Sequence, residues 1–156
     1  MILARWIRLE RDRLAAFAGF ARAQSARAAP AVLWARTAEG NIACALVVPL
    51  KFAPGRSRRW AAWALAPLAA AYRLCGLRAY LEADAICLSG GTIASCETRT
   101  IGECAVALSC FRPVENDFME TLRARIEAQQ GWQFDHSWPS EEERAAIDDA
   151  LALDPA

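Results

Sequence analysis

The apolar and polar positions of this chain follow two different periods in its first third. Residues 3–27 carry apolar side chains at helical spacing opposite an arginine-rich face, which predicts an amphipathic helix. Residues 31–38 and 41–50 are apolar and rich in β-branched side chains, and Glu39-Gly40 between them is typical of a turn. This part of the chain therefore predicts one helix followed by a β-hairpin.

A long uncharged run, from Trp60 to Tyr72, lies within a predicted central helix at residues 58–76. At about 1.5 Å per residue the run is too short to cross a hydrocarbon layer about 30 Å thick. Pro67 is expected to kink or restart the helix, because proline lacks the backbone donor. Two interpretations remain open: a buried helix lying across a sheet, or an interfacial helix with Trp60, Trp63 and Tyr72 among lipid headgroups.

The second half of the chain predicts a meander of three strands followed by a helix. The strands are expected at residues 79–88, 92–100 and 103–111, because glycine-containing turns separate these apolar runs. A helix from about residue 114 or 115 ends at residue 130, before a glycine that is typical of a helix stop.

The last residues, 132–156, look separate from the rest. Ser140 and Glu143 have the spacing of a capping box, and acidic residues fill the first turn of the helix that it begins. We therefore expect residues 1–131 to form a single α+β domain. Residues 132–156 are expected to form a C-terminal segment with a short acidic helix, which packs on the domain or docks to a partner.

The predicted fold class is α+β: a five-stranded antiparallel sheet with helices packed on it. The predicted order is α-β-β-α-β-β-β-α plus a C-terminal helix. This order resembles the roadblock and profilin-like folds, and the resemblance is one of topology that no motif carries. The middle portion alone (strand 41–50, a helix, two strands and a helix) also resembles the ring-building modules of secretion systems, if one of the predicted strands is extra. Such likenesses say little about activity.

Charge is distributed unevenly along the sequence although its net value is zero. Residues 1–80 contain 13 basic and 3 acidic side chains, a net charge of +10, and residues 81–156 contain 5 and 15, a net charge of −10. The two halves either neutralise each other by folding together or leave one basic and one acidic face. The absence of an overall basic excess argues against nucleic-acid binding. A single lysine among many arginines and alanines indicates a GC-rich, bacterial source.

Cysteine usage favours a reducing compartment and no metal. The six cysteines lack CxxC spacing, and His136 is the single histidine, so we expect neither a structural metal nor a cofactor. Free thiols in apolar runs behave as small hydrophobic groups. No secretory signal is apparent. We therefore expect a cytoplasmic location, with a peripheral position at the membrane as the alternative.

Two short segments carry candidate chemistry with a simpler structural explanation. Residues 88–92, Leu-Ser-Gly-Gly-Thr, could hold an anion through backbone N–H groups, but the flanking strands favour a hairpin turn. Glu82 and Asp84 are expected on one face of a strand, where they could bind a cation or act as acid and base. A solvated strand face is the preferred explanation.

Cysteine and histidine chemistry has weaker support. Cys104 and Cys110 could include a reactive thiol, but neither has a neighbouring histidine or helix start to lower its pKa. Asp135 and His136 could form a dyad, but the sequence places no nucleophile beside them. We therefore predict no catalytic residue.

Because no catalytic residue is predicted, the function is inferred from the surfaces that could contact a partner or a membrane. The leading hypothesis is a non-enzymatic interaction domain, an adaptor subunit of a larger bacterial assembly, with a protein partner or self-association. The alternative is a peripheral membrane protein that binds anionic lipid, and a further alternative is a small-molecule binder or small enzyme. The expected partner- or membrane-binding residues are Arg5, Arg8, Arg58, Arg59, Trp60 and Trp63.

Overall fold

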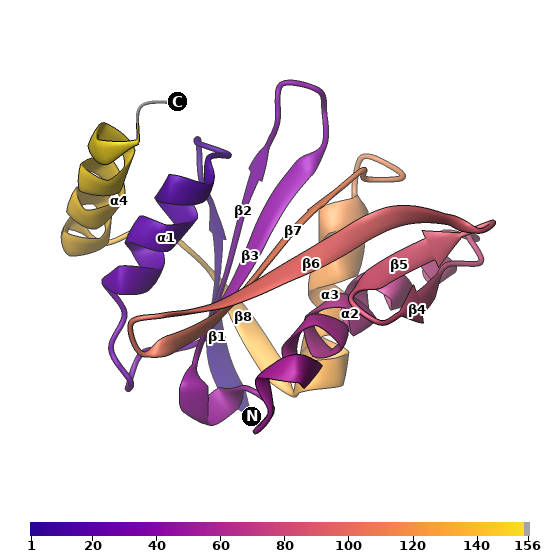
Figure 1. Ribbon diagram of the computed structural model, residues 1–156, viewed down its shortest axis with the longest axis horizontal. Helices are drawn as coiled ribbons and strands as arrows, with labels where there is room; N and C mark the ends of the chain where they lie inside the picture. The colour runs from indigo at the N-terminus through magenta and orange to yellow at the C-terminus, as the bar shows by residue number, and fades with distance from the viewer. Residues whose placement is uncertain (155–156) are drawn as a thin grey trace.

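The centre of the molecule is an eight-stranded mixed sheet, seen in the computed structural model, which describes residues 1–154 (Figure 1). The strands lie side by side in the order β4-β5-β6-β7-β3-β2-β1-β8. Their bounds are β1 (Ile2–Arg8), β2 (Ala31–Arg36), β3 (Ile42–Pro49), β4 (Tyr80–Glu82), β5 (Ala85–Leu88), β6 (Gly91–Ile101), β7 (Cys104–Phe111) and β8 (Trp132–Ser137).

Strand β1 is the parallel element of this sheet. It pairs in parallel with β2 on one side and with β8 on the other, whereas all the other neighbouring strands are antiparallel. Trp6 lies between Val32 and His136 in these registers. The first and last strands of the chain are therefore neighbours.

Helices cover both faces of the sheet (Figure 1). Helices α1 and α4 lie on one face, and α2 and α3 lie on the other. The helical bounds are α1 (Leu14–Arg22), α2 (Trp60–Leu74), α3 (Phe118–Gln130) and α4 (Glu141–Leu153), with short 3-10 turns η1 (Leu50–Phe52) and η2 (Ser57–Arg59) before α2.

Strand alternation divides the apolar side chains between two cores. On β1, Trp6 packs in the core beneath α2 and α3, whereas Ile7 packs in the core beneath α1 and α4. On β2, Val32 and Leu33 divide in the same way. The sheet is apolar on both faces for this reason, and the central strands read as continuous apolar runs.

The prediction of a five-stranded antiparallel sheet is wrong. The sheet has eight strands and is mixed, because β1 and β8 add to one edge and the predicted strand 79–88 is divided. The expected strand is interrupted at Ala83 and Asp84, so that β4 and β5 form a short hairpin. The predicted hairpin at residues 31–50 is confirmed as β2 and β3.

The predicted N-terminal helix at residues 3–27 is also wrong in its first half. Residues 2–8 form β1, and only Leu14–Arg22 is helical. A short apolar run fits both periods, and the parallel pairing that selects the strand involves residues far away in the sequence.

The predicted central helix corresponds to α2, which runs through Pro67 without a break. Its own side chains Leu65, Leu68 and Ala69 are buried in the core that the helix shares with the sheet. The segment therefore lies across a sheet, as the first of the two interpretations stated. None of the helices in residues 1–154 is both long and apolar enough to cross a bilayer.

The C-terminal residues contribute to both the sheet and a helical layer. Trp132–Ser137 forms the edge strand β8, and α4 packs along α1. Gly19 of α1 permits this contact, because a Cβ at that position would lie 2.6 Å from the carbonyl oxygen of Ala146. The ion pairs of Arg5 with Glu143 and of Arg13 with Asp154 join the basic and acidic halves there.

Candidate functional site

A groove lies beside the start of α2, and the loop that precedes this helix forms one of its walls. The indole Nε1 of Trp60 donates a hydrogen bond of 2.8 Å to the carbonyl oxygen of Pro54. The Trp60 side chain is buried, so it anchors the loop to the core. Because this loop is held in place, η2 presents Arg58 and Arg59 at the rim of the groove.

The opposite wall is the turn between β4 and β5. Ala83 has a φ of 55°, in the left-handed region, which costs a residue with a Cβ about 1 kcal/mol. The carbonyl oxygen of Asp84 accepts a 3.0 Å hydrogen bond from the backbone N–H of Cys96, so the turn is tied to β6. Strained backbone that its surroundings hold in place is frequent at functional sites.

The two walls enclose a groove of about 790 Å³, which we call the α2 groove. A volume of this size accommodates a small organic molecule. Its lining consists of Pro54, Arg58, Arg59, Ala61, Ala62, Trp63, Ala83 and Asp84.

Charge and apolar surface lie close together in the α2 groove. Arg58 and Arg59 are exposed, and their side chains form no ion pair or hydrogen bond with any of residues 1–154. Asp84 is the one acidic residue of the lining, so the groove carries an excess of positive charge. Trp63 is half-buried, and its ring packs edge-to-face on Trp132 with centroids 6.0 Å apart.

This arrangement can bind an anion next to an apolar or aromatic group. A guanidinium group presents several N–H donors to a carboxylate or phosphate, and an indole offers a flat apolar surface. Among the lining residues there is no lysine, histidine or cysteine. The groove therefore has the chemistry of a binding site, and its lining contains no evident nucleophile.

The structure brings together three of the six residues that the sequence pointed to. Arg58, Arg59 and Trp63 line the α2 groove, and Trp60 lies behind them as a buried anchor. Arg5 and Arg8 lie on β1 and are not part of this groove.

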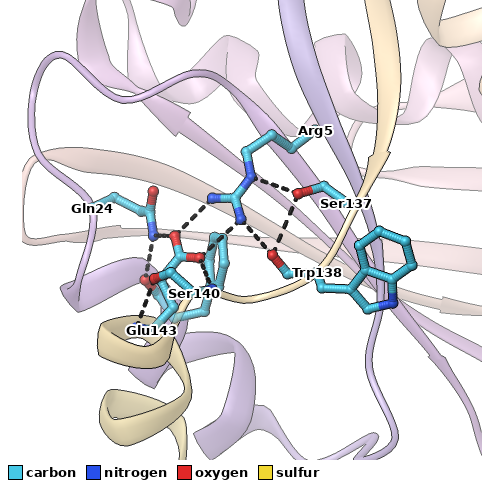
Figure 2. Close-up of polar contacts among 7 residues, drawn as sticks. Arg5, Gln24, Ser137, Trp138, Ser140 and Glu143 are labelled. Atoms are coloured by element: carbon cyan, nitrogen blue, oxygen red, sulfur yellow. Dashed lines mark hydrogen bonds and ion pairs between the residues drawn. The ribbon is translucent and has the colours of Figure 1, made fainter.

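Arg5 takes part in a network that joins β1, β8 and α4 (Figure 2). Its Nη1 and Nη2 atoms donate to the Glu143 carboxylate at 2.7 and 2.9 Å, and its Nε donates to Ser137 Oγ at 3.2 Å. Gln24 Nε2 donates to the same carboxylate at 2.7 Å. All three guanidinium nitrogens of Arg5 thus donate hydrogen bonds within the molecule.

The same network controls the ionisation of Glu143. Burial alone raises the pKa of this carboxyl, but hydrogen bonds from Arg5, the Ser140 backbone and Gln24 outweigh burial and lower the pKa to about 2. The predicted capping box is present, since Ser140 Oγ accepts from the Glu143 N–H and the Glu143 carboxylate accepts from the Ser140 N–H. The carboxylate therefore stays charged at neutral pH and stabilises α4.

Arg8 has a different surrounding. Its guanidinium carbon lies 5.0 Å from the ring centroid of Trp34, a cation–π arrangement. Trp34 in turn contacts Trp6, with ring centroids 6.3 Å apart. Arg8 therefore covers the edge of the aromatic core at the end of β1.

The other candidates from the sequence are placed as structural features. Ser89 and Gly90 form the turn between β5 and β6, so residues 88–92 are a hairpin and begin no helix. Glu82 ends β4 whereas Asp84 lies in the following turn, so the expectation that they share a strand face is wrong. No group of three potential metal ligands is found within residues 1–154.

The remaining candidates do not form a reactive centre. Burial and, as a smaller cause, the charge of Glu103 raise the pKa of Cys104 to about 11. The pKa of Cys110 is raised by burial and then by Asp12 and Glu39. Asp135 and His136 are consecutive in β8, so their side chains point to opposite sides of the strand and form no dyad.

Sequence reasoning missed the groove as a unit. Pro54, Ala83 and Asp84 belong to it but come from segments about thirty residues apart, which no local pattern connects. The sequence pointed to Asp84 only as a possible cation ligand or acid–base group, and not as part of a groove. The one signal in the sequence that could have indicated the groove was the run of basic residues before the central helix.

Comparisons with solved structures identify the architecture. A bipartite lipoate protein ligase from Thermoplasma acidophilum, described with its E2 lipoyl domain, has a TM-score of 0.82 at 8% identity, covering 98% of this chain and 93% of that one. A T. acidophilum lipoate protein ligase structure with bound lipoic acid has a TM-score of 0.80 at 9% identity, covering 97% and 95%. A lipoate-protein ligase A bound with ATP has a TM-score of 0.70 at 9% identity, with the same coverage.

No protein-family model matches the sequence, and no curated protein sequence matches it. The structural matches overturn the interpretation as an adaptor or interaction domain, which was based on the absence of a recognisable site together with the uneven charge of the two halves. Of the residues expected to contact a membrane, those at 2–8 form a strand and Trp60 is buried, whereas Arg58 and Arg59 are exposed. At these identities the likeness extends to architecture alone, and it shows that this chain has the fold of the lipoate-protein ligases.

Proposed function

We propose that this protein binds an anionic small molecule with an apolar or aromatic body, and that the ligand occupies the α2 groove. The observation that carries the proposal is the pair of unpartnered guanidinium groups, Arg58 and Arg59, beside the indole of Trp63 in one groove. Within residues 1–154 neither guanidinium group forms an ion pair or a side-chain hydrogen bond, and Asp84 is the one acid beside the two arginines in the lining. An anion in the groove would form charge-assisted hydrogen bonds with them.

The comparisons support the same class of ligand. One structure of this fold contains lipoic acid, a carboxylic acid with an apolar tail, and another contains ATP, a phosphate-bearing molecule with an aromatic base. Both combine a negative head group with an apolar or aromatic body. The α2 groove offers the matching arrangement, with guanidinium groups at the rim and Trp63 beside them.

The proposal is limited to binding. The side chains that line the groove and carry charge are Arg58, Arg59 and Asp84. Lys51, the single lysine of the sequence, lies over the ring of Phe52 at 4.9 Å and does not line the groove. A lining of this kind can hold and orient an anion, but it offers no side chain suited to forming a covalent bond with it.

A protein partner is a second element of the proposal. The T. acidophilum ligase is described with its E2 lipoyl domain, so proteins of this fold can act on another protein.

The proposal is tested by calorimetric titration of the full chain with lipoic acid, octanoic acid, ATP and AMP. Saturable binding of one of these is expected, and it should weaken as salt is added, because the attraction of exposed arginines is screened. The Arg58→Ala/Arg59→Ala double variant should bind at least about tenfold more weakly, since a hydrogen bond to a charged group is worth about 1.5–3 kcal/mol.

Arg36→Ala provides the matched control, because Arg36 is an exposed arginine at the end of β2 and does not line the groove. This variant should bind like the wild type. Failure of the wild-type protein to bind any of the four compounds would contradict the proposal. Binding that persists unchanged in the double variant would contradict the location.

A further inference from the structure

A second surface lies around Trp138, on the linker between β8 and α4. The Trp138 side chain is 74% exposed, the highest exposure among the large aromatic residues described. Figure 2 shows its indole pointing away from the polar network of Arg5 and Glu143. An exposed indole adds no core contacts, and tryptophan is one of the residue types that dominate binding energy at protein interfaces.

The backbone that carries this indole is held firmly. The carbonyl oxygen of Trp138 accepts a hydrogen bond of 2.9 Å from Arg5 Nη2 and one of 3.4 Å from Ser137 Oγ. On its other side, Pro139 and the capping box that begins at Ser140 fix the start of α4. Trp138 is therefore presented outward from an ordered linker, which reduces the entropy lost when a partner binds it.

A hollow of about 350 Å³, the Trp138 hollow, lies directly beside this indole. Its apolar part includes Leu9, Ala16 and Ile147, which are all buried in the core beneath α1 and α4. Its full lining is Arg8, Leu9, Glu10, Arg11, Ala16, Trp138, Pro139, Arg144, Ile147, Asp148 and Leu151.

The charges of the Trp138 hollow have both signs. The lining contains three arginines, Arg8, Arg11 and Arg144, and two acids, Glu10 and Asp148. A surface of one sign would select a partner of the opposite sign, whereas a surface with both signs can complement a copy of itself. Arg144 and Asp148 are four residues apart on α4, so they lie one helical turn apart on the same face.

From this arrangement we infer that the Trp138 hollow is the contact surface for a second copy of this chain. A twofold axis across α4 brings Arg144 of one copy opposite Asp148 of the other, and the same pair forms again on the far side of the axis. Each exposed indole then covers the hollow of its partner. Since the patch is small, the dimer is a reversible one.

Sedimentation equilibrium of the full chain over a wide concentration range tests this inference. The wild-type protein should show a monomer–dimer equilibrium, and Trp138→Ala should weaken it at least about tenfold, as expected of an interface anchor. Because the indole is exposed, the variant should keep the wild-type melting temperature at concentrations where both proteins are monomeric. A strictly monomeric wild-type protein, or a dimer that Trp138→Ala leaves unchanged, would overturn the inference.

Charge exchange supplies a second, independent readout. Arg144→Asp and Asp148→Arg should each abolish the dimer, because each places like charges opposite one another at both contacts. An equimolar mixture of the two variants should associate again, since every contact then joins an arginine to an aspartate. Failure of the mixture to associate would contradict the twofold arrangement, as would a dimer that tolerates either variant alone.

Two controls separate this surface from general effects. Asp149→Arg changes the charge of a neighbouring exposed residue on α4 that does not line the hollow. Tyr80→Ala removes an exposed aromatic side chain at the far edge of the sheet, on β4. Both variants should dimerise like the wild type, and loss of the dimer in either would move the interface elsewhere.

Discussion

Arg5 and Glu143 are joined by two hydrogen bonds, of 2.7 and 2.9 Å, although they lie 138 positions apart in the sequence. Arg5 belongs to the first strand and Glu143 to the last helix. The Glu143 side chain is buried, and Gln24 and the Ser140 N–H bind the same carboxylate. This contact connects the start of the chain to its end and holds α4 against the sheet.

Replacing Glu143 by alanine is expected to destabilise the protein by about 2–4 kcal/mol. The change leaves Arg5 and Gln24 without an acceptor, removes half of the capping box, and breaks a largely buried ion pair. Chemical denaturation measures the effect. Glu141→Ala, in the same helical turn but exposed, is the control and should change the free energy of unfolding by less than about 0.5 kcal/mol.

The same carboxylate predicts a pH dependence of stability. Its pKa is about 2 in the folded protein and 4.5 in the reference state, so the folded state binds the proton less readily than the unfolded state. Its contribution is therefore fully present above about pH 5 and is lost as the pH falls towards 2, with a total on the order of 3 kcal/mol. Thermal melts of the wild type and Glu143→Gln over this range should converge at the acidic end. Parallel curves would contradict the assignment.

Gly19→Ala is expected to destabilise the protein by about 2 kcal/mol. A Cβ at this position would lie 2.6 Å from the Ala146 carbonyl oxygen and 2.9 Å from the Ala150 Cβ, so α1 and α4 must separate. This overpacking outweighs the gain of about 1 kcal/mol that alanine brings to a helix. Gly55→Ala, where no atom lies within 4 Å of the added Cβ, is the matched control and should be close to neutral in denaturation experiments.

Ala83→Gly is expected to stabilise the protein by up to about 1 kcal/mol, because glycine adopts the φ of 55° without strain. Since Ala83, a lining residue of the α2 groove, has no polar side-chain group to offer a ligand, binding should be retained. The melting temperature measures the gain. Ala85→Gly, within β5, has no strain to relieve and should be destabilising instead.

Several elements could be predicted from local pattern because their stabilising contacts are local. The hairpin of β2 and β3 follows from two apolar runs around Glu39 and Gly40, and the capping box of α4 from the spacing of Ser140 and Glu143. The helix around Trp60 to Tyr72 follows from an uncharged run too short for a bilayer. Arg58, Arg59 and Trp63 were identified from the basic and aromatic residues at the start of that helix.

Other features depend on contacts that no local pattern reports. Residues 2–8 fit a helical period, yet β2 and β8 supply hydrogen-bonding partners on both sides and make them a strand. Arg5 was expected to face a partner. In the structure it donates two hydrogen bonds to a carboxylate from the opposite end of the chain.

By itself, therefore, the sequence determined the short-range elements: a hairpin, a central apolar helix, a capped acidic helix, and a basic and aromatic segment before α2. Only the tertiary structure decided that the sheet has eight strands, that β1 is parallel to both its neighbours, and that Ala83 and Asp84 line one groove together with Arg58 and Arg59. The physical reason is the separation along the sequence of the residues that make each contact. Turns, caps and helices are stabilised by residues a few positions apart, whereas parallel pairing and a groove wall require residues that only the folded chain brings together.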